Sequence, residues 1–123
     1  MWHVRNKLER FVYQRVRGFL RRRHQVRSVI HHVAGCADVM PTVLMGDMNE
    51  WAPRGGCFRE FGKTWHVLAP GRSFPSRRPV ATLDRIVVSD DCQVLRTGVH
   101  HSALAAVGSD HLPVFASLEM PKK

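Results

Sequence analysis

Three short segments of the sequence combine carboxylate, amide and imidazole side chains, the groups that acid–base and phosphoryl chemistry uses. The first is the Gly-Asp-Met-Asn segment at 46–49, which directly follows a short apolar run at 42–45. A strand there would deliver Asp47 and Asn49 to one pocket, where the carboxylate could activate a water and the amide could donate to a phosphoryl oxygen. Taken alone, the same pattern favours a simple Asx turn.

The other two segments contribute an acid and a histidine. Asp84 stands at the start of an apolar run at 83–88, where an unpaired carboxylate would be costly to bury. His111 lies in the Ser-Asp-His-Leu-Pro segment at 109–113 and could act as a general acid or a charge-stabilising cation near neutral pH. A carboxylate that accepts the second ring N–H fixes the tautomer of such a histidine, and Asp84 is the natural candidate. Alone, these residues also fit an exposed strand end and a loop histidine capped by Asp110.

The hydropathy pattern predicts the elements that would position these groups. Apolar residues at helical spacing predict helix over 4–20 and again over 26–33. The stretch 52–81 is rich in glycine and proline and is predicted as loop, with one short apolar patch at 65–68. Short apolar or alternating runs predict strands at 42–45, 83–88, 93–99 and 114–120. The order of helix, strand, long loop and strands predicts an α/β or α+β layered domain.

In this order and strand context, the Gly-Asp-x-Asn, Leu-Asp-x-Ile and Ser-Asp-His-x-Pro segments resemble the C-terminal half of the endonuclease/exonuclease/phosphatase superfamily. The likeness covers residues 21–120 and includes the Ser-Phe-Pro-Ser-Arg-Arg-Pro stretch at 73–79, which looks like the substrate-side loop of that family. The resemblance implies the C-terminal half of a two-sheet, four-layer α/β sandwich. It divides the chain into a partial domain at 21–123 and a divergent basic helical segment at 1–20.

The resemblance also implies a role for each candidate residue. Asp47 would orient or deprotonate the attacking water, and Asn49 would hydrogen-bond the scissile phosphate. His111 would stabilise the charge on the phosphoryl oxygens and would be held in place by Asp84. Asp110 would assist at a site for Mg²⁺ or Mn²⁺, metals that suit hard oxygen ligands. The implied activity is the metal-dependent, in-line hydrolysis of a phosphodiester or phosphomonoester.

Residues outside these segments could contact the substrate. Trp51, Arg77 and Arg78 are predicted to line a substrate groove, the arginines as forks for phosphate oxygens. Solvated loop charge and local packing explain these residues equally well. Members of such a superfamily act on nucleic acids, phospholipids and inositol phosphates, and the sequence does not choose among these phosphoesters.

Two parts of the family pattern are not found in the sequence. The first half of the family domain supplies an early asparagine and a metal-binding glutamate, whereas Glu9 is the only acid before Asp38 here. We therefore expect a truncated domain with little or no phosphodiesterase activity of its own. A half-fold of this kind is predicted to expose an apolar sheet face, through which the chain would self-associate or take up a complementing chain.

The charge distribution supports a second hypothesis. The formal net charge is +9, and residues 1–30 carry nine Lys or Arg side chains against the single acid Glu9. Residues 31–123 are nearly balanced, with ten basic and nine acidic side chains. A basic segment can bind a polyanion, so the alternative function is a non-catalytic nucleic-acid-binding or interaction module.

The cysteines and the hydropathy indicate the compartment. Three cysteines without a Cys-x-x-Cys spacing do not form a disulfide framework, which favours a reducing compartment. With no signal peptide visible and no apolar run long enough to span a membrane, we expect a cytoplasmic protein. A zinc site is a minor alternative, because His31, His32 and Cys36 lie within six residues and His100 or His101 could add a ligand.

Overall fold

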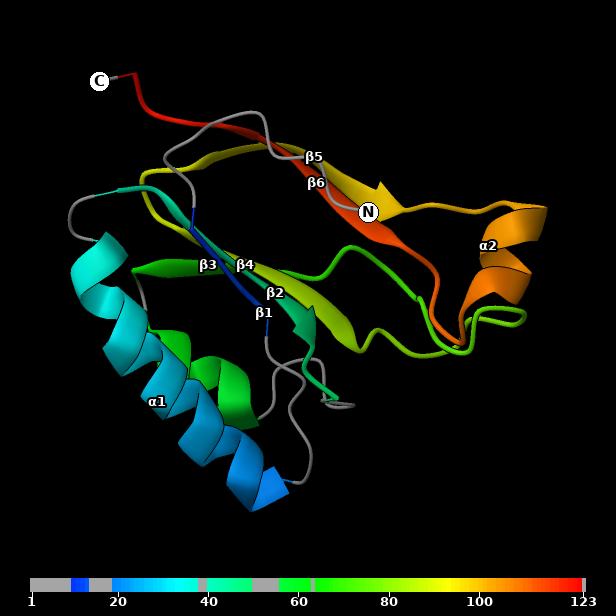
Figure 1. Ribbon diagram of the computed structural model, residues 1–123, viewed down its shortest axis with the longest axis horizontal. Helices are drawn as coiled ribbons and strands as arrows, with labels where there is room; N and C mark the ends of the chain where they lie inside the picture. The colour runs from blue at the N-terminus through cyan, green and yellow to red at the C-terminus, as the bar shows by residue number, and fades with distance from the viewer. Residues whose placement is uncertain (1–9, 14–18, 38–39, 50–55, 63, 123) are drawn as a thin grey trace.

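The computed structural model describes residues 10–13, 19–37, 40–49, 56–62 and 64–122, which form a layered α+β domain (Figure 1). The elements in chain order are β1 (Arg10–Tyr13), α1 (Phe19–Ala37), β2 (Thr42–Asp47), the 3₁₀ helix η1 (Gly56–Phe61), β3 (Trp65–Leu68), β4 (Asp84–Ser89), β5 (Gln93–Val99), α2 (Ala103–Gly108) and β6 (Val114–Glu119). Within the described residues, no helix is long and apolar enough to cross a membrane.

The strands form two sheets. The larger has the order β1-β2-β4-β3, in which β1 runs parallel to β2 and the other neighbours are antiparallel. α1 connects β1 to β2, and a parallel pair requires a crossover connection of this kind. β5 and β6 form a separate antiparallel pair with a register shift between Val94 and Arg96. The layered α+β architecture predicted from the sequence is therefore confirmed.

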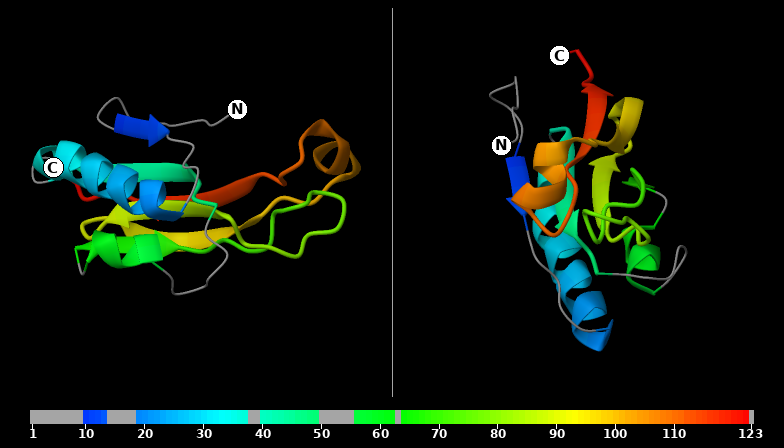
Figure 2. Two further views of the ribbon diagram at one scale, coloured as in Figure 1. Left: turned by 90° about the horizontal axis from the view of Figure 1, so that it is seen from below. Right: turned by 90° about the vertical axis from the view of Figure 1, so that its right-hand side faces the viewer.

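Two apolar cores lie on opposite faces of the larger sheet. α1 and η1 cover one face, and the β5–β6 pair covers the other (Figures 1 and 2). Consecutive residues of β4 show the alternation: Val87 packs with Val26 and Val33 of α1, whereas Ile86 packs with Val114 of β6. All five side chains are buried. The two cores thus share the central strands.

The apolar stripe on α1 confirms the helical run predicted at 26–33. Val26 and Val33 are buried against the sheet, and two partly buried apolar residues lie between them at helical spacing. On the same helix, Arg27 Nε donates to Glu60 of η1 at 2.7 Å, and this hydrogen bond raises the pKa of the Arg27 guanidinium. An ion pair as exposed as this one adds little stability. The apolar stripe therefore does most to hold α1 on the sheet.

The helix predicted over 4–20 is wrong at 10–13, whereas residues 19 and 20 are helical as the start of α1. Arg10–Tyr13 form β1, which pairs in parallel register with residues 42–45 of β2. Phe, Val and Tyr favour strands, and pairing with a neighbouring strand overrides the helical spacing of the surrounding apolar residues. Apart from β1 and the start of α1, the basic segment at 1–20 lies outside the described residues.

The exposed apolar sheet face expected of a half-fold is also wrong for the central strands. β2 and β4 contribute side chains to both cores, and every residue of β4 after Asp84 is buried. The β5–β6 pair supplies the cover, since the chain folds back over this face after β4. The patch at 65–68, predicted within a loop, forms the edge strand β3, whose Trp65 packs edge-on against Phe61 of η1.

Candidate active site

The ends of two neighbouring strands bring Asp47 and Asp84 together. Asp47 is the last residue of β2 and Asp84 is the first residue of β4, and the two are direct partners in the antiparallel register. Directly opposed residues of an antiparallel pair project to the same face. That face also carries Ile86 and Val88, which pack against the β5–β6 pair. Both carboxylates therefore lie at the rim where the two sheets meet.

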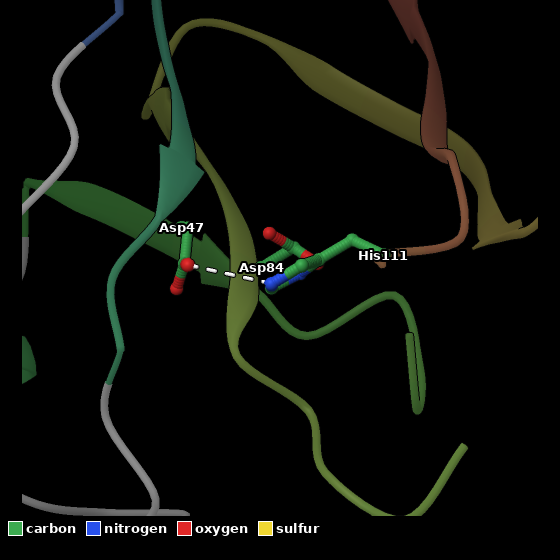
Figure 3. A group of neighbouring side chains, drawn as sticks. All are labelled: Asp47, Asp84 and His111. Atoms are coloured by element: carbon green, nitrogen blue, oxygen red, sulfur yellow. Dashed lines mark hydrogen bonds and ion pairs between the residues drawn. The ribbon is translucent and has the colours of Figure 1, made fainter. Parts of the chain in front are cut away.

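His111 reaches the two carboxylates from the loop between α2 and β6 (Figure 3). Its Nδ1 lies 2.8 Å from Asp84 Oδ2, which is a hydrogen-bond distance. Its Nε2 lies 3.6 Å from Asp47 Oδ2, which is too long for a direct hydrogen bond. The exposed fractions of the His111, Asp84 and Asp47 side chains are 20%, 13% and 15%. The contact predicted between Asp84 and His111 is confirmed, whereas their catalytic roles stay predictions.

The partners of Asp84 determine where the imidazole carries its proton. An ionised carboxylate only accepts hydrogen bonds, so Nδ1 is the protonated nitrogen in this pair. The Ser73 hydroxyl donates to the same Asp84 oxygen. Nε2 is then left to face Asp47, as an acceptor in the neutral ring and as a donor in the charged ring. The imidazole can therefore take up or release a proton at Nε2.

Ser73 also anchors the segments that surround His111. It is fully buried, its N–H donates to the Ala81 carbonyl at 3.0 Å, and its carbonyl accepts from the Leu112 N–H at 2.8 Å. The ring of the next residue, Phe74, lies 4.8 Å from the His111 ring, centroid to centroid. The sequence placed this stretch in a substrate-side loop but missed the contact of Ser73 with the site. Its side-chain direction depends on how the two arms of the loop pair, which no local pattern encodes.

Asn49 continues the chain just beyond β2. Its N–H donates to Asp47 Oδ1 at 2.8 Å, which is the Asx turn that the Gly-Asp-x-Asn pattern favours. The backbone at Asn49 is left-handed, with a φ of 50°, a conformation that asparagine tolerates better than most residues. The Met48 N–H donates to the Leu83 carbonyl at 2.9 Å and extends the pairing of the two strands. Together these bonds hold the Asp47 carboxylate toward the site.

The remaining candidate residues are not members of the group formed by Asp47, Asp84 and His111. Asp110 is exposed, and its carbonyl accepts from the Ser76 N–H at 2.8 Å. Arg77 and Arg78 are exposed in a turn of the loop before β4, which is closed by a hydrogen bond from the Arg78 N–H to the Pro75 carbonyl at 3.1 Å. The predicted substrate residue at position 51, a tryptophan, lies outside the described residues.

A comparison with known protein families shows which family the chain belongs to. A family model described as the Endonuclease/Exonuclease/phosphatase family matches residues 6–111. The chain belongs to this family. The match begins before residue 21, where the sequence motifs placed the start of the likeness, and it includes β1. Among curated proteins, none matches the chain.

Several solved structures share the endonuclease/exonuclease/phosphatase fold of this chain. A functionally unknown conserved protein from Enterococcus faecalis V583 has a TM-score of 0.78 and 18% identity, with 90% of this chain and 50% of that chain covered. An endonuclease/exonuclease/phosphatase from Bacteroides vulgatus has a TM-score of 0.72 and 19% identity, with coverages of 89% and 48%. A mannosyl-6-phosphatase from Bacteroides thetaiotaomicron has a TM-score of 0.69 and 20% identity, with coverages of 91% and 51%. The present chain thus spans about half the length of each.

The candidate site also offers a set of metal-ligand atoms. One atom from each of Asp47, Asp84 and His111 lies within 4.8 Å of the other two, so the group could hold a metal ion. Asp110, which the sequence predicted as the metal ligand, is not a member of this close group. In the described part of the chain, the other histidines form no such group, and the zinc alternative gains no support there.

Proposed function

We propose that this chain carries one half of the active site of a metal-dependent phosphoester hydrolase. The observation that supports the proposal is the place of His111 between two carboxylates. Its Nδ1 is bonded to Asp84 at 2.8 Å, and its Nε2 faces Asp47 across 3.6 Å. Membership of a family of nucleases and phosphatases adds the reaction class.

The separation between Nε2 and the Asp47 carboxylate suits a shared ligand. One water could hydrogen-bond to both groups across that distance, and a phosphoryl oxygen could accept from Nε2 of the charged ring. Asp47 would accept a proton from the attacking water. His111, in its charged form, would donate from Nε2 to a phosphoryl oxygen as negative charge develops there. Asp84 would stabilise the charged ring and hold its orientation, and Asn49 would donate its amide to the scissile phosphate.

The metal of the proposal is Mg²⁺ or Mn²⁺, held by the Asp110 carboxylate. Mg²⁺ binds through one or two carboxylates together with substrate phosphates, and an exposed carboxylate beside His111 suits that role. Asp84 and His111 are hydrogen-bonded to each other. In this proposal the Asp84 carboxylate therefore orients the imidazole and does not bind the metal. When bound, the metal neutralises charge on the phosphoryl oxygens.

The substrate of the proposal is a phosphodiester or a phosphomonoester. One structurally similar protein is a mannosyl-6-phosphatase, and the family name includes nucleases. The exposed guanidinium groups of Arg77 and Arg78 lie on the loop that leads to Asp84 and could grip phosphate oxygens in a bidentate manner. Trp51 would add an apolar contact. Nucleic acids, phospholipids and inositol phosphates all fit this chemistry.

We further propose that efficient hydrolysis needs residues beyond this half of the fold. The chain spans about half the length of the structurally similar proteins. In the sequence, Glu9 is the only acid before Asp38 and therefore the only carboxylate ahead of α1 that could act as a second metal ligand. The other half of the fold, in the same protein or in a complementing chain, would supply that ligand. The chain alone is therefore expected to bind phosphate better than it turns over a phosphoester.

Two measurements on the purified chain test these points. In an amide NMR titration with Mg²⁺ and inorganic phosphate, signals of 47–49, 84 and 109–111 should move, and His111→Ala should reduce the shifts. His66→Ala, which changes an exposed histidine of β3, is the matched control. Hydrolysis of a chromogenic phosphodiester should be undetectable. Absence of shifts at these residues contradicts the site, whereas Mg²⁺-dependent hydrolysis lost in His111→Ala supports the function and overturns its dependence on another half.

A further inference from the structure

Exposed apolar side chains gather at the end of the molecule that carries α2. Among the described residues, the exposed large apolar side chains are Val80, Leu95, Leu104 and Val107. Three of these four lie at this end: Leu104 and Val107 of α2 are 79% and 63% exposed, and Val80 in the loop before β4 is 60% exposed. Single exposed apolar side chains are normal, but a group of them marks a contact surface.

Hydrogen bonds join the two segments that carry these side chains. The Ser76 hydroxyl lies 3.0 Å from the Ala106 carbonyl and 2.6 Å from the Ser109 carbonyl, at the end of α2. Val80 lies on the opposite arm of the same loop, where its N–H donates to the Phe74 carbonyl at 2.9 Å. Figures 1 and 2 show α2 and this loop side by side at one end of the molecule. Leu104 and Val107 are three positions apart in the sequence, so both lie on one side of the helix.

The loop that carries Val80 is positively charged, and the exposed acid Asp110 follows the second segment. Residues 69–82 include Arg72, Arg77 and Arg78 but no Asp or Glu, and residues 98–109 also contain no acid. All three arginines are exposed. The surface therefore combines aliphatic side chains with guanidinium groups, which bind phosphate oxygens well.

We propose that the three apolar side chains and three arginines, here named the tip surface, dock on an anionic lipid bilayer. Aliphatic side chains enter the interfacial region of a bilayer, and cations beside them attract its negative headgroups. A nucleic acid fits less well, because leucine and valine do not stack on bases. His111 follows three residues after the end of α2, so docking would turn the site toward the headgroups. Only this last point rests on the proposed function.

Vesicle sedimentation with the full chain tests docking without any need for catalysis. Vesicles of phosphatidylcholine with about one third phosphatidylserine should bind the chain more tightly than phosphatidylcholine alone. The basic N-terminal segment also attracts anionic vesicles, so the comparison between variants decides the question rather than binding by itself.

The apolar part of the tip surface is tested by Leu104→Gln combined with Val107→Gln. This double variant should weaken vesicle binding about tenfold, because fewer apolar groups enter the interface. The control is Leu95→Gln, which changes a side chain of β5 that is 59% exposed and lies outside the tip surface. The control should bind as the parent chain does. Both substitution sites are exposed, so the fold should be retained, and amide NMR spectra check this.

The cationic part is tested by Arg77→Gln combined with Arg78→Gln. Each lost charge should weaken binding about fivefold. The matched control is Arg59→Gln with Lys122→Gln, which removes the same charge from exposed positions elsewhere. The proposal would be overturned if the tip variants and the controls lost the same vesicle affinity. It would also be overturned if neither tip variant changed the affinity. An arginine variant that loses oligonucleotide binding but keeps vesicle binding would overturn it as well. The phosphate titration at His111 tests the catalytic site separately, so the two proposals can fail independently.

Discussion

At the scale of single residues, one carboxylate oxygen organises the site. Asp84 Oδ2 accepts from the Ser73 hydroxyl and from His111 Nδ1. Ser73 is fully buried and is fixed by its own backbone bonds, so it holds the carboxylate in one position. The carboxylate in turn orients the imidazole toward Asp47. The geometry at Nε2 thus depends on a serine that does not itself face the place where a substrate would bind.

Ser73→Ala should therefore destabilise the chain and loosen the imidazole. The substitution leaves the Asp84 carboxylate with one donor fewer in a shielded place, which costs about 1–3 kcal/mol of unfolding free energy. Urea unfolding measures the loss, and the ring signals of His111 in NMR spectra should broaden or move. Ser117→Ala changes an exposed serine of β6 and should cost under about 0.5 kcal/mol. Equal unfolding free energies for the two variants would show that the Ser73 bond contributes nothing.

At the scale of elements, the β5–β6 pair both closes the second core and carries His111 on its connection. The pair approaches closely at Gly98, which lies opposite Phe115 in the register. A Cβ atom built on Gly98 would lie 2.9 Å from the tip of the Phe115 ring. The same ring lies 5.0 Å from the Arg96 guanidinium. A glycine is needed here because of the aromatic ring, not because of the backbone conformation.

Gly98→Ala should weaken the β5–β6 pair. The Phe115 ring would have to move away from the new methyl group, and such overpacking costs about 1–3 kcal/mol. Thermal unfolding followed by circular dichroism measures the effect. Gly108→Ala is the matched control, because a Cβ at Gly108 meets no atom within 4 Å, and its effect should stay within about 0.5 kcal/mol. If the Gly98→Ala chain were as stable as the control, the Phe115 ring would be able to move aside with no loss of stability.

The elements also show what local sequence patterns can and cannot predict. The strands β2, β4, β5 and β6 were predictable because buried apolar runs of strand length are bounded by turn residues. β1 was not, since its four residues lie within apolar residues at helical spacing and its partner strand is some thirty residues away. α2 was not predicted because its six residues are too short for a periodic signal, although Ser102 caps its start.

Only some contacts of the candidate site could likewise be predicted from the sequence. The pairing of Asp84 with His111 was predictable, because a buried strand carboxylate and a loop histidine each need a partner. Asp47 lies beside Asp84 because of the register between β2 and β4, and this register could not be predicted from the sequence. The contact of Ser73 depends on the pairing of two loop arms and left no signal in the sequence.

At the scale of the whole molecule, the two cores are coupled through β4. Ile86 is 1% exposed in the core between the sheets, and Val87 is 0% exposed in the core beneath α1. Because consecutive residues of one strand serve both cores, loss of packing on one face should also weaken the other. The site lies at the end of the same strand, so its geometry depends on both layers. The molecule is therefore expected to unfold as a single cooperative unit.

Ile86→Ala tests this coupling directly. Removing most of a buried isoleucine side chain leaves a cavity between the sheets and should lower the unfolding free energy by about 2–5 kcal/mol. If the cores are coupled, amide hydrogen exchange should speed up by a similar factor in α1, in β4 and in the β5–β6 pair, although Ile86 packs only in the core between the sheets. Leu95→Ala, at an exposed position of β5, should leave the exchange rates unchanged. Protection retained in α1 but lost in β5 and β6 would mean that the two layers unfold separately, and that the strand ends carrying Asp47 and Asp84 can persist without the segment that presents His111.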